Sequence, residues 1–133
     1  MEKKTNNVLE NIDNKLLCNS LLISDDKEVR DKANELYIWD KKDNYNLWRL
    51  LIGAEDKEVR NKANELYNWD KATKNYLFHT ILYAKDKEIR MKAEKLYNWD
   101  KAKECNLLNI IILAKDKEIK NKANEIYKKR YDK

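Results

Sequence analysis

Glycine, proline, histidine and cysteine are scarce in this chain of 133 residues, which contains one Gly, no Pro, one His and two Cys. Tight β-hairpin turns usually need Gly, so a chain with a single Gly is poorly suited to a β-rich fold. No Gly-rich loop is available to hold a phosphate group. The single histidine, His79, has no matching set of Cys or acidic ligands, which argues against a metal site and a general base. We therefore expect no cofactor and no enzymatic activity.

Long apolar segments are absent as well. No run approaches the roughly 18 residues that a transmembrane helix needs. The polar start, residues 1–7, is followed by neither the apolar core nor the small-residue cleavage site of a signal peptide. These absences predict a soluble, cytoplasmic protein that does not contact a membrane.

Charge is abundant but not concentrated. The chain has 29 Lys and Arg against 24 Asp and Glu, a net charge of +5, and charged residues make up 40% of the sequence. Such a composition suits a thin array of helices with much surface per residue. Because both signs are mixed throughout, the positive balance is weak evidence for a nucleic-acid partner.

One motif returns every 30 residues. It reads Asp-Lys-Glu-Val-Arg at 26–30 and 56–60, Asp-Lys-Glu-Ile-Arg at 86–90, and Asp-Lys-Glu-Ile-Lys at 116–120. A fixed period of this size is typical of a stacked array. The register divides the chain into an N-terminal cap segment, 1–12, and four repeats, 13–42, 43–72, 73–102 and 103–132.

Each repeat is predicted to hold two helices. In the second half of a repeat, Val59, Ala63 and Tyr67 follow helical spacing, and Asp56 is suited to cap the helix start. In the first half, Leu47, Leu50, Leu51 and Ala54 form an apolar face that we expect to be the more deeply buried. Trp48 and Ile52 widen this face, as Leu108 and Ile112 do in the fourth repeat.

A single long helix is excluded by the period. At about 100° per residue, 30 residues leave equivalent positions about 120° apart around the axis, so no continuous stripe would form. The chain must therefore turn inside each repeat. The Asp-Lys pairs are the expected turns, which predicts helices of about 12 to 14 residues.

The pattern Leu-x-x-x-x-Asp-Lys-Glu-Val-Arg-x-Lys-Ala-x-Glu-Leu, from Leu51 to Leu66, resembles the short HEAT-like repeat. All four repeats fit it, over about nine tenths of the chain. The resemblance implies an all-α, right-handed α-α superhelix, a solenoid of four helix-pair repeats whose Val-Arg helices line the concave side. It also implies an Asp-to-Arg ladder between adjacent repeats.

The element Tyr-x-Trp-Asp occurs at 37–40, 67–70 and 97–100. An aromatic residue beside an acid is compatible with a base-stacking site. Packing is the interpretation that we favour, with each Trp covering the following repeat and each Asp capping its first helix. The fourth repeat, which has no successor, has Lys129 and Arg130 at these positions.

The basic residue that ends each repeat motif and the two cysteines each have two possible interpretations. Arg30, Arg60, Arg90 and Lys120 could hold phosphates or form the implied ladder, and we favour the ladder. Cys18 and Cys105 fall in corresponding helices of the first and last repeats, too far apart for a disulfide. We interpret them as buried or incidental thiols rather than nucleophiles, in a reducing compartment.

The outward face of the second helices is the candidate partner-binding surface. Residues opposite the apolar stripe form it: Lys27, Asp31, Glu35, Lys57, Asn61, Asn64, Glu65, Asn68, Lys87, Met91, Lys117 and Asn121. One column of it varies from repeat to repeat, as a surface that recognises a particular partner would. A merely solvated face would look much the same.

We therefore expect a non-enzymatic protein–protein interaction module, an adaptor or an inhibitor of a larger complex, which binds a protein on its concave face. Nucleic-acid binding is the alternative, favoured by the net charge and by a basic C-terminal tail at 128–133 and opposed by the interspersed Glu. HEAT-like DNA glycosylases share only the repeat type, because no acid, base or metal cluster is evident. The sequence specifies neither the partner nor the oligomeric state.

Overall fold

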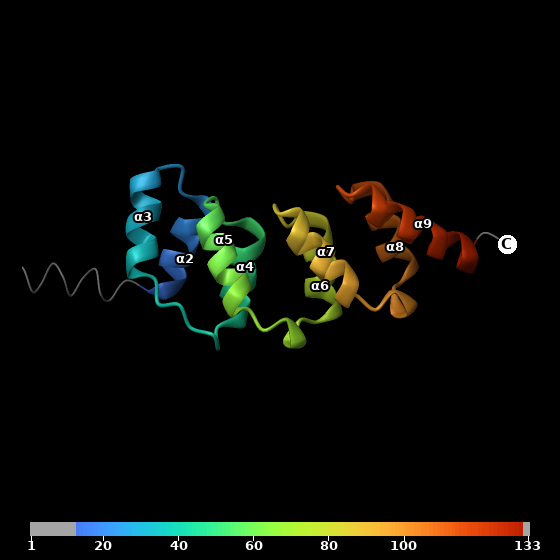
Figure 1. Ribbon diagram of the computed structural model, residues 1–133, viewed down its shortest axis with the longest axis horizontal. Helices are drawn as coiled ribbons and strands as arrows, with labels where there is room; N and C mark the ends of the chain where they lie inside the picture. Colours follow the sequence, from blue (N-terminus) through green and yellow to red (C-terminus); the bar gives the residue numbers. More distant parts are fainter. Residues whose placement is uncertain (1–12, 132–133) are drawn as a thin grey trace, which may run out of the picture. The chain divides into compact units, whose positions relative to one another are not determined.

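The computed structural model describes residues 13–131, so the predicted cap segment 1–12 lies outside the described residues. Between these limits the chain consists of helices and their connections, without a strand. The predicted all-α fold of helix-pair repeats is confirmed. The chain divides into two compact units, one up to Asn68 and one from Trp69, and each contains two helix pairs (Figure 1).

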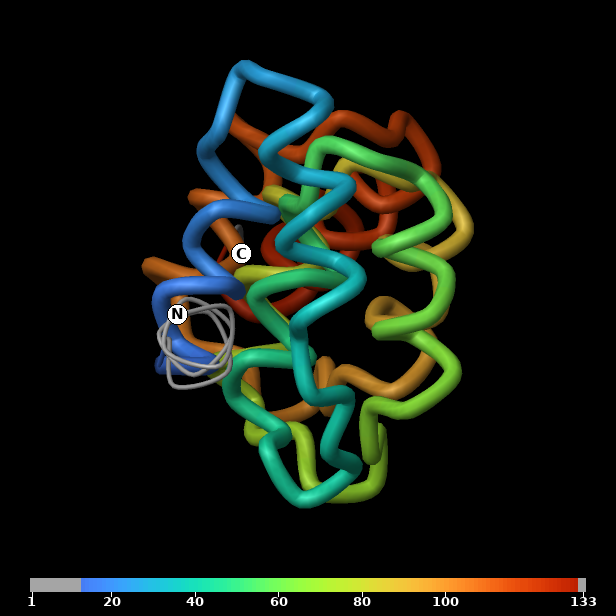
Figure 2. The backbone as a smooth tube through the Cα atoms, turned by 90° about the vertical axis from the view of Figure 1, so that its left-hand side faces the viewer, coloured from blue at the N-terminus to red at the C-terminus, as the bar shows by residue number. Residues whose placement is uncertain are grey.

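In the first unit, the helices are α2 (Asn14–Ile23), α3 (Lys27–Leu36), α4 (Asn44–Gly53) and α5 (Lys57–Leu66). Helix α2 packs against α3, and α4 packs against α5. The first helices of the two repeats, α2 and α4, also contact each other. Figure 2 shows how the chain reverses direction between α2 and α3, from blue to cyan.

In the second unit, the helices are α6 (Lys74–Tyr83), α7 (Lys87–Leu96), α8 (Glu104–Leu113) and α9 (Lys117–Tyr131). Two short 3₁₀ turns, η1 (Trp69–Lys71) and η2 (Trp99–Lys101), precede α6 and α8. The packing repeats that of the first unit: α6 against α7, α8 against α9, and α6 against α8.

The helices are shorter than predicted, with 10 residues each except α9, which has 15. Helix α3 ends at Leu36 because Tyr37 takes an extended conformation, with ψ of 130°. This turns the Tyr37 ring into the core, where the residue is only 4% exposed. Tyr67 and Tyr97 end their helices in the same way.

The predicted capping by the Asp of Tyr-x-Trp-Asp is wrong. Helix α4 is capped by Asp43, whose carboxylate accepts from the Asn46 amide, and Asp40 accepts instead from the Lys42 amide within the loop. Two residues separate the two aspartates, because the loop makes one further turn before α4 begins.

The fourth repeat ends differently from the others. Helix α9 continues through the positions where the other repeats leave the helix. Arg130 donates to the carbonyl oxygens of Trp99, Asp100 and Ala102 at 2.7, 2.7 and 2.6 Å. The residue that replaces the aspartate thus satisfies the backbone of the preceding loop.

Burial follows the two predicted stripes. Leu47, Leu50 and Leu51 of α4 are fully buried, and Val59 and Ala63 of α5 are almost so. The expectation for Leu108 and Ile112 is wrong: they are 37% and 68% exposed, because they lie on a side of α8 that other described segments leave uncovered.

The Arg-to-Asp ladder is present inside each unit. Arg30 Nε donates to Asp56 at 3.0 Å, and Arg30 Nη1 donates to the Ser24 carbonyl oxygen at 2.8 Å. Arg90 donates to both oxygens of Asp116, at 2.7 and 3.1 Å. Each arginine therefore links two repeats. It binds the C-terminal end of the first helix in its own repeat and the start of the second helix in the next repeat.

We predict that Asp116→Ala lowers the free energy of unfolding by about 3 to 5 kcal/mol, because it leaves the buried Arg90 guanidinium without its counter-charge. Asp26→Ala is the matched control. Asp26 occupies the same repeat position but only caps α3, so its loss should cost about 1 kcal/mol. Urea denaturation followed by circular dichroism measures both; equal losses would contradict a structural role for the ladder.

Candidate functional site

The twelve predicted partner-binding residues lie almost entirely on the second helices. Lys27, Asp31 and Glu35 are on α3; Lys57, Asn61, Asn64 and Glu65 on α5; Lys87 and Met91 on α7; Lys117 and Asn121 on α9. Asn68 follows α5 in the loop, where its backbone exchanges hydrogen bonds with the Asn44 side chain. All are exposed except Asn64 and Met91, which are half-buried.

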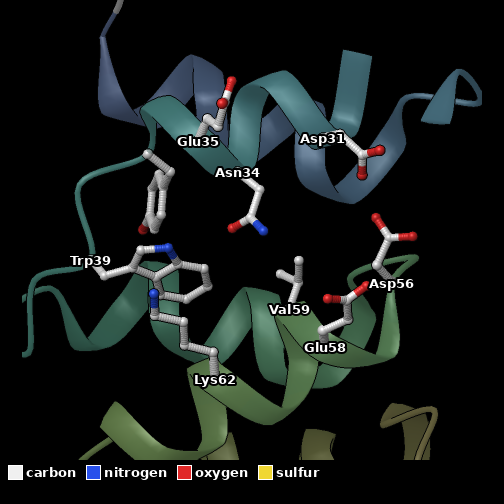
Figure 3. Close-up of a pocket in the computed structure, with 9 residues that line it drawn as sticks. Asp31, Asn34, Glu35, Trp39, Asp56, Glu58, Val59 and Lys62 are labelled. Atoms are coloured by element: carbon white, nitrogen blue, oxygen red, sulfur yellow. The ribbon is translucent and has the colours of Figure 1, made fainter. Parts of the chain in front are cut away.

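A pocket of about 380 Å³ lies in the first unit, between α3 and α5. It is lined by Asp31, Asn34 and Glu35 of α3, Tyr37 and Trp39 of the following loop, and Asp56, Glu58, Val59 and Lys62 at the start of and along α5. Figure 3 shows Trp39 and Lys62 at one end, Asp56 and Glu58 at the other, and Val59 between them. Two of the predicted residues, Asp31 and Glu35, are thus brought together.

The aromatic end of the pocket is built by two rings and a cation. Tyr37 and Trp39 meet edge to face, with centroids 5.0 Å apart. The Lys62 ammonium lies 4.9 Å from the centroid of the Trp39 ring. Such a contact is worth about 0.5 to 1 kcal/mol at an exposed site. Because Lys62 belongs to the next repeat, the contact supports the packing interpretation of Trp39.

At the aromatic end of the pocket, the Tyr37 hydroxyl group is buried and has no hydrogen-bond partner among the described residues. Burial raises its pKa. Burial likewise raises the pKa of the equivalent Tyr97, and the Asn106 side chain partly offsets this rise. In the first unit, the side chain of the corresponding Asn46 donates a hydrogen bond to Asp43 and accepts one from Arg49.

The acidic end of the pocket holds weakly engaged carboxylates. Asp31 pairs with Lys27 at 3.3 Å, but both side chains are more than 60% exposed. Exposed pairs of this kind contribute about 0 to 1 kcal/mol. Glu58 makes no ion pair with any other described residue. Asp56 accepts from Arg30 through Oδ2, while its Oδ1 is 3.9 Å from the Lys27 ammonium.

At the α7/α9 junction of the second unit, the residues equivalent to the pocket lining pair with one another. We call this the closed junction. Glu94 occupies the position of Asn34 and pairs with Lys122 at 2.8 Å. Lys122 also lies 5.2 Å from the Trp99 ring centroid, and the Trp99 indole donates to the Glu94 carbonyl oxygen at 3.1 Å. Trp99 is consequently buried, whereas Trp39 is half-buried.

A second substitution has a similar effect. Met91, at the position of Asp31, packs partly against the core of its unit. Without a carboxylate there, Lys87 pairs with Glu118 across the junction at 3.3 Å. A bond from its own backbone amide and this contact with Lys87 lower the pKa of Glu118. In the first unit, Asp31 holds the equivalent Lys27, and Glu58 is left unpaired.

Most of the pocket is not evident from the sequence, which indicates packing for Trp39 and gives no signal for Lys62. The predicted capping by the Asp56 side chain is wrong, because that carboxylate binds Arg30 and makes no cap hydrogen bond. A signal was present at the Asn34 position, which reads Asn, Asn, Glu, Asn through the four repeats. The consequence of that single Glu follows only from its distance to Lys122.

Other reactive groups do not gather into a site in residues 13–131. No group of three or more His, Cys, Asp or Glu side chains there could hold a metal ion. Cys18 is fully buried, and burial raises its pKa, whereas Cys105 is exposed. None of the described helices has the length and apolarity to cross a membrane.

Comparison of the chain with family models, curated proteins and solved structures finds no significant match.

The two thiols should react very differently. At neutral pH, iodoacetamide should modify Cys105 in the folded protein and leave Cys18 unmodified, because the buried Cys18 thiol has a raised pKa and no access to solvent. In urea both should react. Peptide mass spectrometry measures the two rates, and comparable rates in the folded protein would contradict this placement of Cys18.

Proposed function

We propose that this chain is a non-enzymatic protein-interaction module, an adaptor or an inhibitor of a larger complex, which acts in the cytoplasm and binds its partner on the outward face of its second helices. The resemblance to HEAT-like repeats is part of this proposal, since helical repeat arrays commonly bind partners along an extended face. The observation that supports it best is the pocket between α3 and α5.

The pocket has the chemistry of a recognition site. It combines an apolar wall, Trp39 and Val59, with convergent polar groups from two helices. Asn34 in its centre makes no hydrogen bond with another described residue, so its amide can still bind a ligand. Ligand sites usually have this composition, with a few placed polar groups on an apolar surface.

Nucleic-acid binding receives less support. Four carboxylates and one lysine line the pocket, and the carboxylates would repel a phosphate backbone. Arg130, one of the cations of the basic tail, is committed to three backbone carbonyl groups. Protein therefore stays the favoured partner.

We predict that the immobilised chain captures a protein from an extract of its source cells and that capture survives nuclease treatment. Asp31→Lys should reduce capture by about tenfold or more. The new ammonium group would repel a partner whose positive charge complements the acidic pocket. The fold should be unaffected, since Asp31 makes only an exposed ion pair.

Asp25→Lys is the matched control, with the same change in charge at an exposed position in the turn before α3. It should leave capture unchanged. Equal losses in both variants would point to a general charge effect, and loss of capture after nuclease treatment would favour the nucleic-acid alternative; either result contradicts the proposal.

A further inference from the structure

We propose that the pocket between α3 and α5 receives one arginine side chain from an extended segment of the partner protein, with its guanidinium group at the carboxylates of Asp31, Asp56 and Glu58. This inference rests on the proposed function and specifies the chemistry of the partner. Three features of the first unit carry it: an Asp56 oxygen that accepts no hydrogen bond and a Glu58 carboxylate that makes no ion pair, both within the described part of the chain, and an apolar surface beside them.

The oxygen without a hydrogen bond is Asp56 Oδ1, whose one ionic contact among the described residues is the Lys27 ammonium group at 3.9 Å. Arg30 binds only Oδ2, and no described donor lies within hydrogen-bond distance of Oδ1. The Asp56 side chain as a whole is 17% exposed. In the α7/α9 junction, Arg90 binds both oxygens of Asp116 and leaves no equivalent vacancy. A carboxylate oxygen that accepts no hydrogen bond favours a further charged donor.

The unpaired carboxylate is Glu58. Its equivalent in the second unit, Glu118, pairs with the Lys87 ammonium group at 3.3 Å. Lys27 would serve Glu58 in the same way, but its ammonium lies between Asp31, at 3.3 Å, and Asp56, at 3.9 Å. The acidic end thus has more carboxylates than the chain's own cations satisfy.

The apolar wall consists of Val59 and the Trp39 ring, and Val59 lies between the acidic end and the aromatic end. Val59 separates Glu58 and Asp56 from Trp39 and Lys62 in Figure 3. A long side chain that enters here can place its methylene groups against Val59 and Trp39 and its charge at the carboxylates. The pocket volume of about 380 Å³ is within the range of ligand sites.

Arginine fits the acidic end better than lysine. The carboxylates come from two helices, with Asp31 on α3 and Asp56 and Glu58 at the start of α5. A planar guanidinium group with five donors can bind several carboxylate oxygens at once, whereas an ammonium group is a compact, strongly hydrated charge. Arg30 already binds in this way, to a carboxylate and a carbonyl oxygen together.

Of the lysines near the pocket, Lys27 competes with the incoming arginine and Lys62 does not. Lys62 stays at the aromatic end on the Trp39 ring, away from the carboxylates. Lys27 competes directly, but its pair with Asp31 is exposed and therefore weak. A guest arginine displaces the Lys27 ammonium, so removing that ammonium strengthens binding.

The experiment titrates the ¹⁵N-labelled full chain with acetyl-Gly-Gly-Arg-Gly-Gly-amide at up to millimolar concentration, and with the same peptide carrying citrulline or lysine instead. The arginine peptide should shift the Trp39 indole signal and the Asp56 and Glu58 amide signals in a saturable way. Citrulline, which lacks the charge, should bind about tenfold more weakly, and lysine at least about threefold more weakly.

Four variants of the chain locate the site. Asp31→Met with Asn34→Glu reproduces the closed α7/α9 junction and should abolish the response without lowering the melting temperature. Lys27→Met should strengthen binding about two- to threefold. Glu58→Gln should weaken it by a similar factor, whereas Glu28→Gln, the same change one repeat earlier and outside the pocket, should leave it unchanged.

Equal binding of the arginine and citrulline peptides, equal binding of arginine and lysine, shifts confined to other helices, or an unaltered response in the closed-junction variant would each overturn the arginine assignment. Such a result leaves the proposed function standing if Asp31→Lys still removes the captured protein. If both experiments fail, the interaction surface itself is wrong.

Discussion

The contact between the arginine of one repeat and the aspartate of the next is the interaction on which the arrangement of the helix pairs in each unit depends. A repeat of 30 residues presents a hydrophobic stripe that is too small to fold alone, so neighbouring repeats must be held in register. The arginine does this from a nearly buried position. It binds the carboxylate of the next repeat and the carbonyl group six residues before it, and in doing so satisfies polar groups that packing has removed from water.

Around this contact, the two units differ in how the junction between their second helices is completed. In the second unit, Met91 and Glu94 let Lys87 and Lys122 pair across the junction, and Trp99 becomes buried. In the first unit, Asp31 and Asn34 occupy those two positions, so the same lysine positions find other partners and a pocket stays open. Two substitutions within one repeat pattern therefore separate a structural junction from a candidate binding site. The helix pairs and the ladder recur at both junctions, but the backbone also differs, because Trp99 begins the 3₁₀ turn η2 whereas Trp39 lies in a loop without one.

The helices, their pairing and their apolar faces could be predicted from the sequence, because the 30-residue period and the spacing of residues such as Val59 and Ala63 follow directly from helix geometry. The helix ends were less predictable. Tyr37 leaves the helix to bury its ring, and Asp43 rather than Asp40 caps α4, and both choices depend on tertiary packing. The outward position of Asp31 and Glu35 could also be predicted. The pocket could not, because whether Lys62 or Lys122 closes a junction depends on a carboxylate that another helix must place within about 3 Å.

The claim that one junction is open and the other closed can be measured on the indole protons. The Trp99 indole donates to a buried carbonyl oxygen, whereas the Trp39 indole makes no hydrogen bond within the described part of the chain. Hydrogen exchange of the two Nε1 protons, followed by NMR on the ligand-free protein, compares the junctions in one sample. We expect the Trp99 proton to exchange at least about tenfold more slowly than the Trp39 proton. Equal rates, or slower exchange at Trp39, would contradict the account.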